Sequence, residues 1–377
     1  MSEVMDKTQV LEEKPNSKSA GETAYLDTLL RDLVAKDGSD LHMKVGEPPI
    51  FRIHGSLKRT QHPVLTSEDT KKILFSLMKE EQRKRFLEDL ELDISYFIHD
   101  LARFRVNVFC QKGNIGAVMR VIPLKIQTID EWGLPQILKK IALQHRGFVL
   151  VTGPTGSGKT TTLAAMIEHI NSLERRHIIT IEDPIEFLHN DNMATIEQRE
   201  LGVDTHSFAI ALRHVMRQNP DVILVGEMRD LETISMAITA AEMGSLVFAT
   251  LHTTDAAQTV DRIIDVFPPE QQQQVRLQLS NSLEAVISQT LLPLVKKDEG
   301  RVAAFEILIC TSGVRNVIRE GKAYQLYSLI QAGQRYGMQL LDQSLRELYL
   351  RGVVSYGDAL SKASNPQEFE QSVGRIK

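Results

Sequence analysis

A chain of 377 residues that is 42% hydrophobic and 25% charged is long enough to bury the cores of about two to three domains. Its formal net charge of −5 argues against a protein whose main task is to grip nucleic acid. Its 2 cysteines exclude a disulfide framework and a four-cysteine zinc site within one chain. No apolar run approaches the roughly 18 residues of a membrane span, and residues 1–22 contain no signal-peptide core. We therefore expect a soluble, cytoplasmic protein without direct membrane insertion.

The N-terminal third is predicted to be a tail followed by a small domain. Residues 1–22 are polar and rich in Ser, Glu and Lys, which predicts a disordered tail. Residues 23–123 are predicted to form an α+β domain with an antiparallel sheet. Thr66 is a suitable N-cap for a helix, because Asp69 occupies its third position. The predicted elements are a helix at 25–34, strands at 40–45 and 50–54, a helix at 66–78, and strands at 92–99, 102–110 and 115–122.

A linker at 124–133 is expected to lead into a second domain at 134–310. There strands and helices alternate, which is typical of a mainly parallel sheet covered by helices. The expected elements are strands at 148–152, 177–181, 222–225, 246–250 and 302–309, helices at 207–217 and 231–243, and one long helix over 269–292. Residues 311–377 are predicted to be helical, with an apolar stripe of Met338, Leu341, Leu345 and Leu348 and an end at Gly352.

The segment GPTGSGKT at 153–160 dominates the second domain. It follows a buried strand and opens a helix, which is the context of a phosphate-binding P-loop. Glycines let backbone N–H groups turn toward phosphate oxygens, and the helix N-terminus adds positive charge. An ordinary glycine turn would lack this agreement of motif and flanks. The predicted nucleotide-binding residues are Gly153, Pro154, Thr155, Gly156, Ser157, Gly158, Lys159, Thr160 and Thr161, with Lys159 on the β- and γ-phosphates and Thr160 on Mg²⁺.

Three carboxylates follow the next predicted strand, in the segment TIEDPIEF at 180–187. They are Glu182, Asp183 and Glu186. Ligands bind at this edge of open α/β sheets, and hydrolysis needs a carboxylate to orient or deprotonate water. A solvated acidic turn is the alternative, but beside a P-loop we favour function.

Two later strands end in polar groups at the same predicted edge. The run DVILVGE at 221–227 places Glu227 at the tip of a buried strand, an arrangement typical of an acid held near Mg²⁺. His252 follows the strand at 246–250, where it is either structural or a sensor of the γ-phosphate.

Arg105 and Arg120 lie on adjacent predicted strands of the first domain. They either belong to a solvated sheet face or stabilise transition-state charge in a neighbouring subunit, as arginine fingers do. Their spacing leaves both interpretations open.

Four motifs in order make the chain similar to the type II/IV secretion ATPase superfamily, and especially to its type IV pilus retraction ATPases. The motifs are GPTGSGKT at 153–160, TIEDPIEF at 180–187, PDVILVGEMRD at 220–230 and GSLVFATLHT at 244–253. The resemblance implies a RecA-like P-loop core with a PAS-like N-terminal domain, ATP bound between the two, and a hexamer. It also implies hydrolysis of ATP with Mg²⁺ for mechanical work.

The same resemblance assigns roles to the candidate residues. Glu186 is the leading general base and Glu182 its competitor, while Glu227 positions Mg²⁺ and water. Arg105 and Arg120 look like the family's paired fingers. One departure concerns the histidine motif, which usually carries two histidines, because Ser245 stands at the position of the first.

The segment GVRNVIRE at 313–320 is similar to a motif of retraction ATPases. We expect Val314, Val317 and Ile318 to pack inward. Arg315, Asn316, Arg319 and Glu320 are the candidate coupling residues, and of these Arg315, Arg319 and Glu320 are expected to face outward. Assembly ATPases usually carry a long N-terminal extension and a four-cysteine zinc motif, and this sequence shows neither.

We therefore interpret the chain as a hexameric motor that retracts type IV pili and acts at the inner membrane through a platform protein, with no nucleic-acid partner. The alternatives within the superfamily are an accessory retraction paralogue and a pilus assembly or type II secretion ATPase. Outside it stand a nucleic-acid translocase, which uses a similar ring, and an ATP-binding scaffold that does not hydrolyse.

Overall fold

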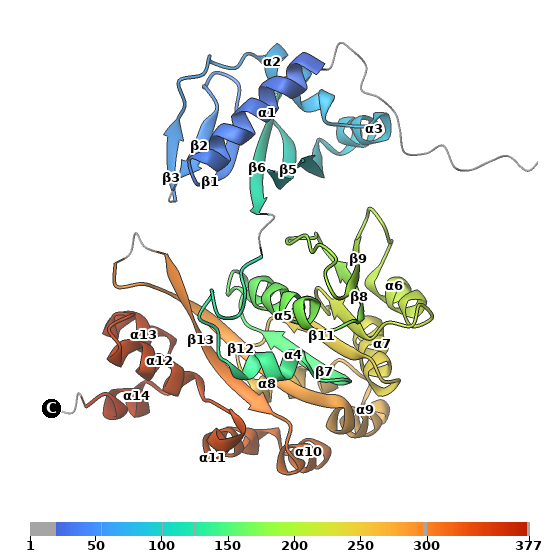
Figure 1. The fold of residues 1–377 in the computed structure, drawn as a ribbon, viewed down its shortest axis with the longest axis vertical. Coiled ribbons are helices and arrows are strands. Elements are labelled where there is room, and N and C mark those ends of the chain that lie inside the picture. Colours follow the sequence, from blue (N-terminus) through green and yellow to red (C-terminus); the bar gives the residue numbers. More distant parts are fainter. Residues whose placement is uncertain (1–19, 54, 100, 124–125, 297–299, 375–377) are drawn as a thin grey trace, which may run out of the picture. The chain divides into compact units, whose positions relative to one another are not determined.

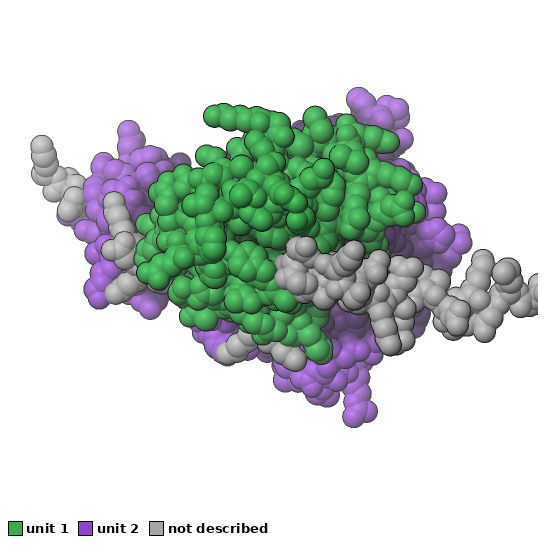
Figure 2. All heavy atoms as spheres, turned by 90° about the horizontal axis from the view of Figure 1, so that it is seen from above, with its two compact units in different colours: residues 1–124 green, residues 125–377 purple. Residues whose placement is uncertain are grey.

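The computed structural model describes residues 20–53, 55–99, 101–123, 126–296 and 300–374. The chain forms two compact units, residues 1–124 and residues 125–377, which Figure 2 colours separately. Each unit has its own sheet and its own hydrophobic core. Within the described residues, no helix combines the length and the apolarity needed to cross a membrane.

The first unit is a six-stranded antiparallel sheet with helices on one face (Figure 1). The strand order is β3-β2-β1-β6-β5-β4. Helix α1 packs on β1 and α2 on β6, and the leucines of α1 are fully buried against them. The elements are α1 (Ala20–Ala35), β1 (Gly38–Met43), β2 (Ile50–Ile53), β3 (Ser56–Arg59), α2 (Ser67–Ser76), α3 (Glu80–Asp89), β4 (Glu91–Ile98), β5 (Ala102–Gln111) and β6 (Asn114–Pro123).

Strand β5 shows why only one face of this sheet is covered. Phe104, Val106 and Val108 are buried in the core under the helices, whereas Arg105 between them is exposed. Successive side chains of a strand point to opposite faces, so an alternating sequence gives one apolar and one polar face. The predicted alternation is confirmed, and the open face carries arginines.

Most predicted elements of this unit are present. The Thr66–Asp69 capping box at the start of α2 is confirmed by hydrogen bonds in both directions. Strand β3 and helix α3 were not predicted, because both are polar and α3 buries a single side chain, Phe86. Helix α1 begins at Ala20, inside the predicted tail of 1–22, and the rest of that tail lies outside the described residues.

The second unit is built on a seven-stranded sheet in the order β13-β12-β7-β11-β10-β8-β9 (Figure 1). All neighbours pair in parallel except β12 and β13, so the mainly parallel sheet is confirmed. The strands are β7 (Gly147–Thr152), β8 (His177–Glu182), β9 (Thr195–Glu200), β10 (Val222–Val225), β11 (Leu246–Leu251), β12 (Leu283–Pro293) and β13 (Arg301–Ile309). The helices among them are α4 (Ile137–Ala142), α5 (Lys159–Leu173), α6 (Phe208–Val215), α7 (Leu231–Glu242), α8 (Ala256–Asp265) and α9 (Pro269–Ser282).

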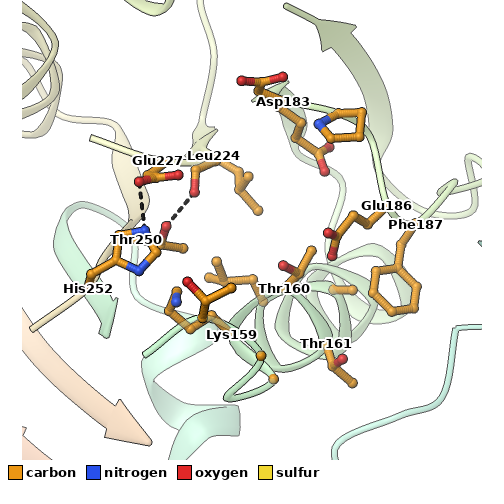
Figure 3. A pocket seen from close by; sticks show the side chains of 18 of the residues that line it. Lys159, Thr160, Thr161, Asp183, Glu186, Phe187, Leu224, Glu227, Thr250 and His252 are labelled. Carbon is orange, nitrogen blue, oxygen red and sulfur yellow. Dashed lines mark hydrogen bonds and ion pairs between the residues drawn. The ribbon is translucent and has the colours of Figure 1, made fainter. Parts of the chain in front are cut away.

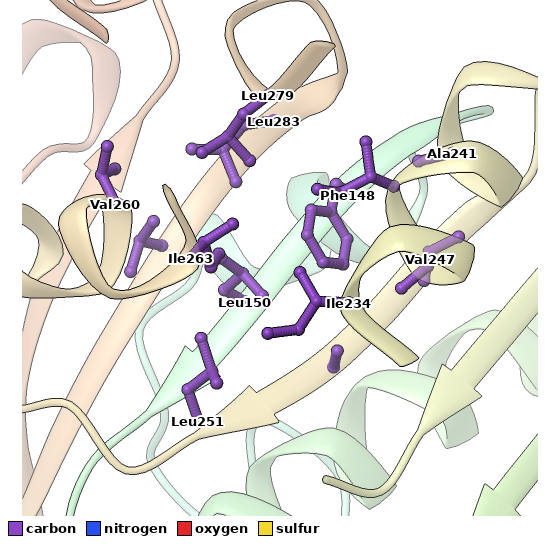
Figure 4. Close-up of a cluster of buried hydrophobic side chains, with 14 of the residues drawn as sticks. Phe148, Leu150, Ile234, Ala241, Val247, Leu251, Val260, Ile263, Leu279 and Leu283 are labelled. Atoms are coloured by element: carbon purple, nitrogen blue, oxygen red, sulfur yellow. The ribbon is translucent and has the colours of Figure 1, made fainter. Parts of the chain in front are cut away.

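Both faces of this sheet are buried. On β7, Phe148 and Leu150 join one apolar cluster, to which α7 contributes Ile234 (Figure 4). The intervening Val149 and Val151 join a second cluster on the opposite face. A strand covered on both faces is apolar throughout, which leaves polar groups only at its ends. The polar candidate residues of this unit are therefore expected at the edge of the sheet where the strands end.

The predicted long helix at 269–292 is wrong in its second half. Helix α9 ends at Ser282, and the chain continues directly into β12 at Leu283. β-Branched Val286 and Ile287 suit a strand between β7 and β13, but no glycine or proline marks the change. Strand β9 was also missed, because its sequence TIEQRE is polar and lies at the sheet edge.

Two segments flank the second sheet, the expected linker before it and a helical region after it. Within the expected linker, Ile129 is buried in the second unit's core. The C-terminal region is helical, as expected, and consists of α10 (Ser312–Arg319), α11 (Leu326–Ala332), α12 (Leu341–Leu350), α13 (Tyr356–Lys362) and α14 (Pro366–Ser372). Met338 is buried but precedes α12, so it does not belong to the predicted stripe of that helix.

Candidate nucleotide-binding site

The loop between β7 and α5 has the backbone that a phosphate-binding loop needs. Gly158 caps α5 with a φ of 89°, and Gly153 has a φ of 140°. A Cβ at position 153 would lie 2.3 Å from the carbonyl oxygen of Gln289 on β12, so only glycine fits there. The loop leads directly into the N-terminus of α5, where the helix dipole favours an anion.

A cavity of ≈ 380 Å³ opens beside this loop (Figure 3). Lys159 lines it, and its Nζ donates to the carbonyl oxygens of Gly153 (2.8 Å) and Pro154 (3.2 Å). Burial lowers the pKa of Lys159, while Glu227 and Glu186 act in the opposite direction. Of the predicted residues, the cavity is lined by Thr155, Gly156, Gly158, Lys159, Thr160, Thr161, Glu182, Glu186, Glu227 and His252. Gly153, Pro154 and Ser157 belong to the loop but are not among the lining residues.

The two glutamates after β8 differ in their surroundings. Glu182 is buried, and its Oε1 accepts hydrogen bonds from Thr180 Oγ1 (2.7 Å) and Gln198 Nε2 (3.0 Å). Burial raises the pKa of Glu182. Glu186 is exposed, and its carboxylate points into the cavity from the side opposite Glu227 (Figure 3). Of the two, Glu186 is the accessible carboxylate.

Glu227 follows β10 and is held by two neighbours. Its Oε2 accepts a hydrogen bond from Arg229 at 2.7 Å. Its Oε1 contacts His252 Nε2, also at 2.7 Å (Figure 3). The hydrogen bond from Arg229 lowers the pKa of Glu227, and His252 adds to this. The strand ends of β8, β10 and β11 thus bring three predicted groups to one cavity, as the parallel register requires.

Several residues around the cavity were not predicted. Phe187, His189, Leu291 and Arg301 line it. Gln289 supports the loop from β12, because its Nε2 donates to the carbonyl oxygen of Ser157 at 2.7 Å. Phe187 closes the TIEDPIEF motif, but Gln289, Leu291 and Arg301 carry no local signal, since they belong to a hairpin whose first strand the sequence did not reveal.

Comparison with known proteins places these observations in a family. The model of the type II/IV secretion system protein family matches residues 16–303. The chain belongs to this family. It is 51% identical to the type IV pilus retraction ATPase PilT of Pseudomonas aeruginosa over 336 residues, which cover 89% of this chain and 97% of that protein. It is 41% identical to the type IV pilus ATPase PilU of the same organism, over 91% of this chain and 89% of PilU. A crystal structure of the pilus retraction motor PilT with bound ADP matches with a TM-score of 0.86 and 45% identity, over 91% of this chain and 98% of that one.

The comparisons confirm the expected resemblance to retraction ATPases of the type II/IV secretion family and the expected fold class. Ser245, at whose position the sequence resemblance led us to expect a histidine, lies before the start of β11, and its Oγ donates to the carbonyl oxygen of Pro220 at 3.1 Å. His252 follows the end of that strand, about 20 Å away at the usual rise per residue. Position 245 is therefore at the sheet edge opposite the cavity.

The two arginines that the family resemblance marks as fingers lie side by side in the first unit. Arg105 on β5 pairs directly with Arg120 on β6. Arg120 Nε donates to Asp40 at 2.9 Å, whereas Arg105 lies 3.7 Å from Asp93. Both belong to the open face of the sheet.

Helix α10 carries the candidate coupling motif of the retraction branch. Val314, Val317 and Ile318 are buried, as expected. The expectation that Arg315 faces outward is wrong. Arg315 donates to the carbonyl oxygens of Ser280 and Asn281 and forms an ion pair with Glu284 at 2.7 Å. The exposed residues of the predicted set are Asn316, Arg319 and Glu320.

Proposed function

We propose that this chain is an ATP-hydrolysing motor that drives the retraction of type IV pili as a ring of six copies. The observation that carries the proposal is the single cavity that gathers Lys159, Glu186 and Glu227 at the edge of a parallel sheet. The relative PilT is named as a retraction ATPase, and a solved PilT structure holds ADP. The name of the relative supports pilus retraction as the function, and the ADP in the solved structure supports a nucleotide in this cavity.

The cavity residues fit ATP together with Mg²⁺. Lys159 would meet the β- and γ-phosphates, and the N–H groups of the loop would surround them. The hydroxyl of Thr160 and the carboxylate of Glu227 line the cavity and offer the oxygen donors that Mg²⁺ prefers, with Glu227 acting directly or through water. Mg²⁺, when bound, supplies positive charge to the phosphate oxygens.

Glu186 is the general base in this proposal. Its carboxylate is exposed to the cavity, whereas Glu182 is buried and already accepts two hydrogen bonds on one oxygen. A base must reach the water whose proton it takes. His252, bonded to Glu227, senses the state of the γ-phosphate.

Arg105 and Arg120 stabilise transition-state charge at the cavity of a neighbouring subunit. Arginines that act on the cavity of a neighbouring copy require an assembly, and we propose that this assembly is the ring of six copies. The exposed Asn316, Arg319 and Glu320 of α10 couple the ring to an inner-membrane platform protein, so the motor lies in the cytoplasm and meets the membrane through that partner.

The alternatives make different predictions. The identity to PilT exceeds that to PilU by ten percentage points (51% against 41%), which favours the principal motor over an accessory paralogue. A nucleic-acid translocase would be stimulated by DNA and would bind it with a steep salt dependence. A scaffold that does not hydrolyse would release no phosphate.

Pilus retraction in cells tests the proposal. The gene is deleted and replaced by the wild type or by Lys159→Ala, and fluorescently labelled pili are followed in each strain. We expect pili that extend and do not retract in the deletion and Lys159→Ala strains, and normal retraction with the wild type. Normal retraction in the deletion strain would contradict the role as principal motor.

A further inference from the structure

A row of charged residues crosses the open face of the first sheet. Arg52 on β2 pairs directly with Asp40 on β1, Asp40 with Arg120 on β6, and Arg120 with Arg105 on β5. Directly paired residues of antiparallel strands point to the same face with Cβ atoms about 5 Å apart. Two adjacent arginines repel each other, and a negative charge in the same row offsets this repulsion.

Asp40 supplies that charge from an unusual position. Its side chain is 4% exposed, although it lies on the open face, because the neighbouring arginines cover it. Its Oδ1 accepts from Arg120 Nε at 2.9 Å. Its Oδ2 accepts from Ser39 Oγ at 2.8 Å and lies 3.5 Å from Arg52 Nε. Both carboxylate oxygens are thus engaged, and the carboxylate cannot turn freely.

The contact through Nε determines how Arg120 is presented. A guanidinium is planar, and a carboxylate bound at Nε fixes that plane while the two terminal amino groups remain at its outer end. The side chain of Arg120 is 68% exposed, so its outer end extends from the sheet. The buried carboxylate at its base limits the directions in which it extends.

Arg105 offers an internal contrast. Its carboxylate neighbour, Asp93, is 57% exposed and 3.7 Å away. A solvated pair at that distance restricts a side chain weakly. The two paired arginines are therefore held differently, Arg120 by a buried anchor and Arg105 by a loose surface contact.

We infer that Asp40 is a positioning residue for the motor, which fixes the guanidinium of Arg120 so that it meets a phosphoryl group bound by a neighbouring subunit. The inference rests on the proposed role of Arg120. Arg52 shares the carboxylate, which keeps the buried charge compensated while Arg120 reaches outward.

Four variants test the inference by ATP turnover of the purified full chain. Asp40→Asn keeps the size of the side chain but removes its charge, and we expect kcat to fall about tenfold with little change in KM, as misplaced catalytic groups cause. Asp93→Asn is the matched control on the same face and should change kcat by less than about twofold. Arg120→Ala should lower kcat more than Asp40→Asn. The double variant Asp40→Asn/Arg120→Ala should be no slower than Arg120→Ala, because Asp40 acts only through Arg120.

The outcomes separate the inference from the function on which it rests. Full activity of Arg120→Ala would defeat the finger role and, with it, the inference. Impaired Arg120→Ala beside unimpaired Asp40→Asn would defeat the positioning role alone. A further tenfold loss in the double variant would show that Asp40 acts independently of Arg120 and would also overturn the inference.

Mixing of subunits excludes a trivial folding defect. Asp40→Asn subunits retain their cavity and Lys159→Ala subunits retain their arginines, so mixed rings should regain turnover that neither variant has alone. Absence of this rescue, with Arg120→Ala rescued in the same assay, would overturn the inference. Should Asp40→Asn fail to fold, Ser39→Ala removes only the hydroxyl that restrains Oδ2, and kcat should fall in the same direction by a smaller factor; unchanged kcat in that variant would count against the positioning role.

Discussion

The two sheets of this chain place their polar groups differently. In the second unit, alternate residues of a strand such as β7 enter separate cores on the two faces, and the polar groups follow the strand ends. In the first unit, one face is covered and the arginines lie along the strands on the other. Burial therefore decides whether a sheet carries its charges at an edge or across a face.

This difference matches the two tasks that we propose. An edge where several strands end forms a cavity that can surround a small ligand. An open face instead presents long side chains outward to something that approaches it. Variants of the sheet edge should therefore affect turnover more strongly than variants elsewhere in the chain.

Removal of the central cation at the sheet edge should have the largest effect. Lys159→Ala deletes the positive partner of the β- and γ-phosphates, and we expect kcat to fall by at least about 1,000-fold. Phosphate release by the purified protein measures this. Thr161→Ala, on the same helix and cavity lining, is a control for local packing and should retain more activity. Turnover of Lys159→Ala at the wild-type rate would contradict the P-loop assignment.

The two glutamates after β8 come next. Glu186→Gln keeps the size of the side chain but removes the base, and kcat should fall about 100- to 1,000-fold while ATP still binds. Glu182→Gln should reduce kcat less, since Glu182 serves Thr180 and Gln198 within the protein. Turnover and binding of a fluorescent ATP analogue distinguish the two. An inactive Glu182→Gln beside an active Glu186→Gln would show that the base is the buried carboxylate.

The sequence predicted the sheet edge well, because its signals are local. The P-loop is contiguous, and Glu182, Glu186, Glu227 and His252 each follow an apolar run that is long enough to mark a strand. The carboxyl ends of parallel strands lie at one edge of the sheet, so the strand predictions alone placed these groups at a common edge.

The errors in the site trace back to two missed strands. Gln198, which engages Glu182, lies on β9, and Gln289, which supports the P-loop, lies on β12. Arg315 was expected to face solvent, but it binds carbonyl oxygens at the end of α9. A longer helix was predicted there, so that end was not located. A polar edge strand and an apolar strand that continues a helix both lack a local signal, and their partners depend on distant chain segments.

One carboxylate on a covered face of the second sheet is an exception to the contrast between the two sheets. Glu306 on β13 is buried, accepts from the N–H of Ala256 at the start of α8, and is also bonded to the backbone of Leu341. Burial raises the pKa of Glu306 to about 7, from an ordinary 4.5. Between these values the folded state binds more protons than the unfolded state, so stability should fall as pH rises from about 4.5 to about 7.

Glu306→Gln isolates this effect. The variant removes the ionisation but keeps an oxygen for the N–H of Ala256. The free energy of unfolding of the variant, minus that of the wild type, should increase with pH by up to about 3 kcal/mol across this range. Denaturant unfolding at several pH values between 5 and 8 measures the difference, in which other titrating groups cancel. A difference that is constant with pH would show that Glu306 has an ordinary pKa.

The smallest effects concern the two arginines of α10, which share a helix and differ in their contacts. Arg315 binds the last carbonyl oxygens of α9 and Glu284, so Arg315→Ala should destabilise the second unit by about 1–2 kcal/mol. Arg319 is exposed, and Arg319→Ala should change stability by no more than about 0.5 kcal/mol. Denaturant unfolding of both variants, with the wild type beside them, measures these values.

The same pair separates structure from coupling. If α10 docks the ring onto the pilus machinery, Arg319→Ala should leave phosphate release unchanged in vitro and still impair pilus retraction in cells. Arg315→Ala would impair retraction only in proportion to its loss of stability, and lowering the growth temperature should restore it. Retraction at the wild-type rate in the Arg319→Ala strain would assign α10 to the stability of the second unit alone. Loss of both turnover and retraction in the Arg319→Ala variant would show that Arg319 serves ATP hydrolysis by the ring and not its coupling to the pilus machinery.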